Sequence, residues 1–187
     1  MDAVVTKCGA LLATPDLPSL GPEPRAGRDS LVSLEKKLGQ FFRDTGLPED
    51  AHALVRSLVL LWHDHLDESH SVSQEIHTAD GSFLHGIMHR REPDYGNAKY
   101  WFRRVGQHPA FPPIAQRAAA AQKDSGDHDL GLNFSSGQWD SFAFIDACQS
   151  ALKSPRDAEK IRRLQKIQEI EFRVLLELFC SQGRPEK

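Results

Sequence analysis

The chain is organised around a central stretch at 62–111, and its residues 85–101 read His85-Gly-Ile-Met-His89-Arg-Arg-Glu92-Pro-Asp94-Tyr95-Gly-Asn97-Ala-Lys99-Tyr-Trp101. Seven of the nine histidines fall within 62–111. Ionisable and amide side chains alternate there with aromatic ones, at a density that a purely structural helix seldom holds. We therefore predict that this stretch builds a polar site inside the fold.

The sequence on both sides of this stretch has the period of amphipathic helices. Apolar residues recur at three- and four-residue steps over 31–42 and over 161–178. Asp29 or Ser30 is suited to cap the first of these helices and Gly46 to end it. The other expected helices cover about 48–74, 82–91, 94–105 and 114–123, with one more around 139–148. No segment reads as a strand, so we predict a mainly α single-domain bundle of about six or seven helices without significant sheet.

The N-terminal segment differs in composition from the rest of the chain. Residues 1–28 contain four prolines and three glycines and show no sustained apolar period. Such a segment buries little apolar surface to offset the entropy of ordering it. We expect a flexible arm at 1–28, an all-α domain at 29–183 and a short C-terminal tail at 184–187.

Composition excludes several classes of function. The formal net charge of −3 disfavours nucleic-acid binding, which normally needs a basic face. No apolar run approaches the roughly 20 residues of a membrane-spanning helix, so no membrane insertion is expected. The three cysteines lie far apart in the sequence without a C-x-x-C pair, which suits a reducing cytoplasm. We therefore expect a soluble cytoplasmic protein.

Two polar stripes are expected to face each other across neighbouring helices. The first follows the spacing i, i+4, i+7, i+11 and comprises His63, Asp67, His70 and Gln74. The second follows the spacing i, i+4, i+7 and comprises His85, His89 and Glu92. A turn at 79–81 would fold the two helices antiparallel and bring the stripes together, as in metal sites of helical bundles. The candidate ligands of a divalent metal such as zinc are His63, His70, His85 and His89.

Proton transfer is the chemistry that these residues would serve in an enzyme. His89 is the first choice as general base or metal ligand, and the candidate catalytic set is His89, His85, Glu92 and Asp67. Cationic and aromatic residues follow directly in the sequence, and guanidinium groups match carboxylates and phosphates while aromatic faces stack on rings. The candidate binding residues for a small anionic or polar molecule are Arg90, Arg91, Tyr95, Asn97, Lys99 and Trp101.

Three interpretations of the histidine-rich stretch stay open at this point. It could hold a metal ion, form a metal-free polar pocket, or pack as a polar layer with a structural role alone. The first two favour an enzyme that performs acid–base or metal-assisted chemistry on a small molecule. The third favours a non-enzymatic binding or scaffolding protein whose histidine, aspartate and arginine layer fixes the helix register.

The run from His85 to Trp101, with the histidine-rich 62–70 before it, resembles a family of soluble helical proteins from bacteria and fungi. The likeness covers roughly residues 50–180. That family has no established activity, so the resemblance implies a grouping and no chemistry. A looser likeness, carried by His85, His89 and Arg90 alone, links the chain to four-helix metalloproteins of the damage-inducible type, which also carry an H-x-x-x-H-R helix.

Overall fold

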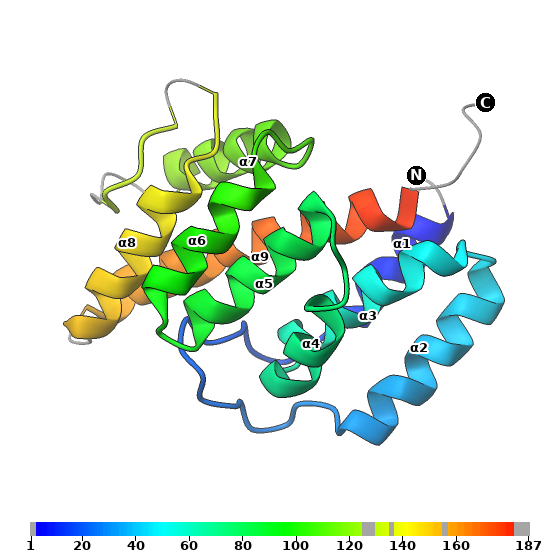
Figure 1. Ribbon diagram of the computed structural model, residues 1–187. Coiled ribbons are helices and arrows are strands. Elements are labelled where there is room, and N and C mark those ends of the chain that lie inside the picture. Colours follow the sequence, from blue (N-terminus) through cyan, green and yellow to red (C-terminus); the bar gives the residue numbers. More distant parts are fainter. Residues whose placement is uncertain (1–2, 125–129, 135–136, 155–156, 182–187) are drawn as a thin grey trace.

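The computed structural model describes residues 3–124, 130–134, 137–154 and 157–181, and within these ranges the chain forms nine α-helices and no strand (Figure 1). The helices are α1 (Ala3–Leu11), α2 (Leu31–Thr45), α3 (Glu49–Trp62), α4 (Leu66–Ser73), α5 (Ala79–Arg91), α6 (Tyr95–Val105), α7 (Phe111–Asp124), α8 (Ser141–Lys153) and α9 (Ala158–Ser181). The predicted mainly α class is confirmed, but six or seven helices was too low a number. Every helix in the described ranges is too short or too polar to cross a membrane. The predicted tail at 184–187 lies outside the described residues.

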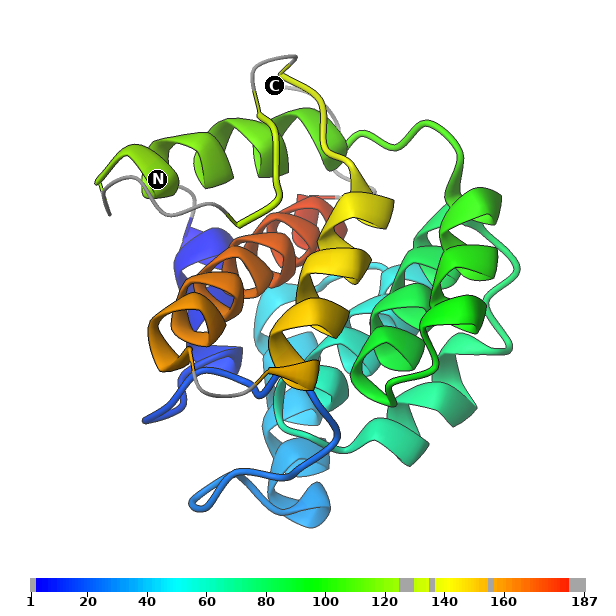
Figure 2. The same cartoon turned by 90° about the vertical axis from the view of Figure 1, so that its left-hand side faces the viewer.

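Helices α9 and α5 form the centre of the bundle. The long helix α9 contacts α1, α3, α7 and α8, and α8 lies between α9 and α6 (Figure 2). Helix α5 contacts α3, α4 and α6, and all of its residues from Gly81 to Arg91 are buried. A helix buried on every face must satisfy each of its polar side chains inside the protein. The histidines and arginines of α5 are therefore core residues.

Several helix ends follow the local signals in the sequence. Ser30 caps α2 by accepting a hydrogen bond from the backbone N–H of Ser33, and Gly46 ends that helix at a φ of 60°. Asp94 caps α6 by accepting from the N–H of Asn97. Helix α5 begins earlier than expected, because Thr78 caps it by accepting from the N–H of Gly81.

The helix predicted over 48–74 is broken in two, which corrects the first polar stripe. Helix α3 ends at Trp62 and α4 begins at Leu66, and between them Asp64 has a φ of 62°. Aspartate tolerates this left-handed conformation better than most residues. Its carboxylate accepts hydrogen bonds from Arg25 and Arg91, and these ion pairs hold the break in place.

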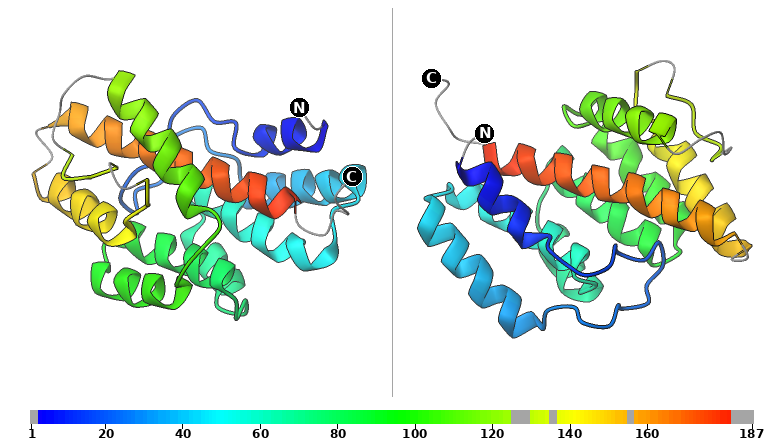
Figure 3. Two further views of the ribbon diagram at one scale, coloured as in Figure 1. Left: turned by 90° about the horizontal axis from the view of Figure 1, so that it is seen from above. Right: turned by 180° about the vertical axis from the view of Figure 1, so that it is seen from behind.

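The segment 3–28 packs onto the domain, which differs from the flexible arm that we expected. Helix α1 runs beside the C-terminal part of α9 (Figure 3), and Cys8, Leu11, Leu12 and Leu20 are buried in the core. After α1 the chain is tied down by polar contacts: Arg25 donates to the carboxylate of Asp64 and to the backbone carbonyl of Trp62. Residues 3–28 therefore belong to the all-α domain.

The structure also pairs two cysteines that the sequence spacing did not connect. Cys8 of α1 and Cys180 of α9 form a disulfide across 172 positions of the chain, whereas Cys148 is a buried free thiol. Disulfides persist mainly in oxidising compartments. The disulfide is therefore evidence against the cytoplasmic location that we expected from the cysteine spacing. That location stays an untested prediction.

A thiol count checks this pairing directly. Protein denatured without reductant is expected to show one reactive thiol per chain, that of Cys148, because Cys8 and Cys180 are bonded to each other. The count should rise to all three cysteines after reduction. A Cys148→Ala variant serves as the control and should show none before reduction. Three reactive thiols in the unreduced wild type would show that the two helices are packed without a covalent link.

Candidate metal centre

Three histidines converge where α4 packs against α5. His70 comes from α4, and His85 and His89 come from successive turns of α5. Each offers one ring nitrogen, and the three nitrogens lie within 4.8 Å of one another. Nitrogen ligands of one zinc ion lie about 3.4 Å apart, since each is about 2.1 Å from the metal. Small rotations of the side chains would close the cluster around an ion.

The ring of His85 is held firmly at this position. It stacks on Trp101 of α6 with the ring centroids 4.0 Å apart and an angle of 19° between the planes. The close approach of α5 and α6 needs Gly86, because a Cβ atom there would lie 2.7 Å from the ring of Phe102. The buried Nδ1 of His85 has no hydrogen-bond partner within the described part of the chain. A buried nitrogen left in this way calls for a ligand.

His89 lies next to a carboxylate and an amide. Its Nδ1 is 3.2 Å from the carboxylate of Glu92, and its Nε2 is 3.0 Å from the side-chain amide of Asn97. A carboxylate on one ring nitrogen fixes the orientation of a metal-binding histidine and makes the other nitrogen a better donor. Glu92 is therefore placed to support His89, and a metal ion at Nε2 would replace the hydrogen bond that the Asn97 amide donates there.

The environment keeps two of the rings neutral at neutral pH. Burial, together with positive charge on His89 and His70, lowers the pKa of His85 to about 4. Burial also lowers the pKa of His89, although Glu92 acts in the opposite direction. A neutral imidazole keeps the lone pair that a metal ion needs, so these rings need not lose a proton before they bind one.

Two members of the predicted stripes lie elsewhere. The Nε2 of His63 is 2.9 Å from the backbone carbonyl of Leu11, and its ring faces the N-terminal segment. Asp67 is exposed on α4. Both positions follow from the break at Asp64, which changes the direction of the chain between His63 and His70. The predicted ligand set therefore loses His63, and Asp67 does not join the cluster.

The two arginines expected to bind a ligand are fully buried and paired. Arg90 donates to Glu171 of α9, and its guanidinium lies 4.5 Å from the ring centre of Phe144. Arg91 donates to Asp64 and to backbone carbonyls, including that of Leu61. These cations hold helices together and do not face the histidine cluster.

The other predicted binding residues are divided among different parts of the surface. Lys99 pairs with Asp146 of α8, and Tyr95 lines a separate surface cavity with Pro22 and Gln149. Only Trp101 and Asn97 contact the histidine cluster. The sequence interpretation missed Glu171 as the partner of Arg90. The signal was a carboxylate within the apolar stripe of the last helix, between Ile167 and Leu175.

No protein-family model, curated protein or solved structure matches this chain. The fold and the cluster must therefore support any function by their own geometry and chemistry.

Proposed function

We propose that the cluster of His70, His85 and His89 binds a divalent transition-metal ion, with zinc as the first candidate, and uses it for chemistry on a small polar molecule. The observation that carries this proposal is the convergence of three ring nitrogens from two helices within 4.8 Å. Three protein ligands leave a fourth position of a tetrahedral zinc ion to water or substrate, as in catalytic zinc sites. His70 is only half-buried, which supports access from solvent to that position.

The surrounding residues supply the supporting roles. Trp101 holds the plane of His85, and Glu92 orients His89 by accepting a hydrogen bond from its Nδ1–H. A zinc ion lowers the pKa of bound water to about 7, so the water can act as a base or nucleophile at neutral pH. A polar substrate fits this arrangement better than an anionic one, because Arg90 and Arg91 are already paired with carboxylates.

Metal analysis of protein purified without a histidine tag tests the proposal. We expect about one metal ion per chain in the wild type and a loss of that ion in the His85→Ala, His89→Ala double variant. The exposed His77, in the connection between α4 and α5, provides a matched control. The His77→Ala variant should keep the metal. A Glu92→Gln variant should bind zinc roughly 10- to 100-fold more weakly, because it weakens the support of His89.

The proposal fails if the double variant and His77→Ala retain the same metal content, or if the wild type neither contains zinc nor gains thermal stability from added zinc. The second candidate function would then stand, namely a non-enzymatic helical protein whose polar layer is structural. The buried Arg90–Glu171 and Arg91–Asp64 pairs favour that alternative, because they tie α5 to α9 and to the α3–α4 break.

A further inference from the structure

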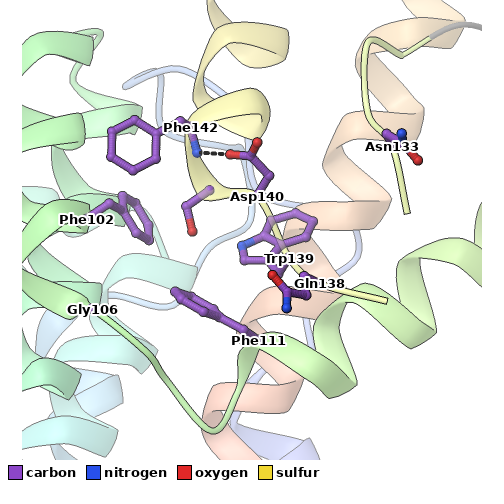
Figure 4. Close-up of a pocket in the computed structure, with 9 residues that line it drawn as sticks. Phe102, Gly106, Phe111, Asn133, Gln138, Trp139, Asp140 and Phe142 are labelled. Carbon is purple, nitrogen blue, oxygen red and sulfur yellow. Dashed lines mark hydrogen bonds between the residues drawn. The ribbon is translucent and has the colours of Figure 1, made fainter. Parts of the chain in front are cut away.

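A cavity separate from the histidine cluster lies between the C-terminal end of α6 and the starts of α7 and α8. Its volume is about 400 Å³, and its walls include Phe102 of α6, Phe111 of α7, and Trp139 and Phe142 at the start of α8 (Figure 4). Successive residues of α6 thus serve different sites, since Trp101 stacks on His85 and Phe102 lines this cavity. Cavities of this size bind small molecules in many proteins.

The aromatic walls are held by other rings behind them. Phe83 packs against Phe102 and Phe111, with ring centres 5.1 and 5.6 Å away. The indole of Trp139 is 5.0 Å from Phe144 and is stacked parallel to Phe134 at 6.2 Å. Packed rings of this kind keep their positions without a ligand, so the cavity is preformed.

Two buried polar groups in the lining have no partner within the described residues. The indole Nε1 of Trp139 and the hydroxyl Oγ of Ser141 make no hydrogen bond there, although the two residues are only 6% and 5% exposed. The Trp139 nitrogen is turned toward the side of the cavity formed by Phe102 and Phe111 (Figure 4). An indole N–H can only donate, whereas a hydroxyl can donate and accept. Buried polar groups normally have hydrogen-bond partners. A molecule fits here if it accepts a hydrogen bond from the indole N–H and forms a second hydrogen bond with the Ser141 hydroxyl.

The charge of the lining selects against anions. Asp140 contributes a carboxylate to the lining, and one of its oxygens caps α8 by accepting from the backbone N–H groups of Phe142 and Ala143. A metal ion or a simple ammonium ion would bring no acceptor to the indole N–H, and an anion would be repelled by the carboxylate. We propose that this cavity is a binding site for a neutral, planar ring compound that carries an adjacent carbonyl and N–H, as in a bicyclic lactam.

Binding of 2-quinolinone, a neutral bicyclic lactam, tests this proposal by NMR on isotopically labelled protein. The three tryptophans give separate indole N–H signals, and a Trp139→Phe variant identifies the one from Trp139. Adding the lactam should shift the Trp139 signal and leave those of Trp62 and Trp101 in place. Naphthalene-2-carboxylate, a planar bicyclic anion, should produce a smaller shift at the same concentration.

Two serine variants on α8 measure the contribution of the hydroxyl. Ser141→Ala should weaken lactam binding roughly threefold to tenfold, which is the effect of losing one hydrogen bond. Ser150→Ala lies on the exposed side of the same helix and should bind as the wild type does. The proposal is overturned if the Trp139 signal does not move up to the solubility limit of the lactam. Equal affinities in the two serine variants would overturn it as well.

Discussion

Replacing Glu171 with leucine is expected to lower the free energy of unfolding by about 3–5 kcal/mol, because the change leaves a buried arginine without its counter-charge. Arg90 and Glu171 are fully buried, and Nη2 of Arg90 lies 2.5 Å from a carboxylate oxygen of Glu171. The remaining contacts of Arg90, to the amide oxygen of Gln168 and the ring of Phe144, carry no negative charge. Urea denaturation followed by circular dichroism measures the loss.

A surface pair on the same helix gives the matched control for this experiment. Glu177 of α9 pairs with Arg117, and their side chains are partly exposed to solvent, at 40% and 45%. Glu177→Leu should cost less than about 1 kcal/mol, because water replaces the lost contact. The double variant Arg90→Met, Glu171→Leu should regain most of the stability, since it removes both buried charges. Equal denaturation midpoints for Glu171→Leu and Glu177→Leu would contradict the role assigned to the buried pair.

The helical class and several helix ends could be predicted because they depend on neighbouring residues. Apolar spacing along the chain indicated the helices, and Ser30, Gly46 and Asp94 cap or end them through hydrogen bonds within a few positions. The break at Asp64 could not be predicted in this way. No proline or glycine marks it, and the arginines that stabilise it lie 39 and 27 positions away in the sequence.

The packing of residues 3–28 was missed for a related reason. This segment is rich in proline and glycine, and its apolar residues do not recur with a helical period. Single apolar residues such as Leu12 and Leu20 are nevertheless buried in the core. The Cys8–Cys180 pair joins positions near opposite ends of the chain, and no local spacing indicates it. Contacts of this range depend on the whole fold and not on any one segment.

The histidine cluster could be predicted in part. The i, i+4 spacing placed His85 and His89 on one face of a helix, and that required no knowledge of the fold. Whether His63 or His70 would join them depended on the direction of the chain after Trp62, which the left-handed Asp64 sets. The cavity beside α6 was not found from the sequence, because Phe102, Phe111 and Ser141 come from three separate helices.

Replacing Asp64 with asparagine should destabilise the protein by about 3–5 kcal/mol at neutral pH, since it leaves the fully buried Arg91 without a negative partner. Asparagine has the same shape as aspartate and also tolerates a positive φ, so the change removes the charge and leaves the backbone conformation at 64 accessible. Arg25 loses the same partner. Hydrogen exchange of backbone amides near Arg25 should therefore accelerate in the variant, alongside a lower denaturation midpoint.

The effect of this substitution should shrink as the pH falls, and its direction follows from the pKa of Asp64. Burial alone would raise that pKa, but the charge of Arg91 and hydrogen bonds from Arg25 and Arg91 outweigh burial and hold it below the ordinary value of 3.8. A carboxyl group whose pKa is lower in the folded state than in the unfolded state contributes its full stabilisation at a pH above its unfolded-state pKa. It loses that contribution as the pH falls through its folded-state pKa. The wild type and Asp64→Asn should thus converge in stability below the ordinary pKa of aspartate.

Asp146→Asn is the matched control, because Asp146 pairs with Lys99 but its side chain is 56% exposed. That variant should differ little from the wild type at any pH, since an exposed pair contributes less than about 1 kcal/mol. A constant difference in stability between the wild type and Asp64→Asn from neutral to acidic pH would show that the carboxylate charge is not what holds Arg91. The same result would mean that something other than these ion pairs causes the break between α3 and α4. The choice of His70 over His63 as the third member of the histidine cluster would then need another explanation.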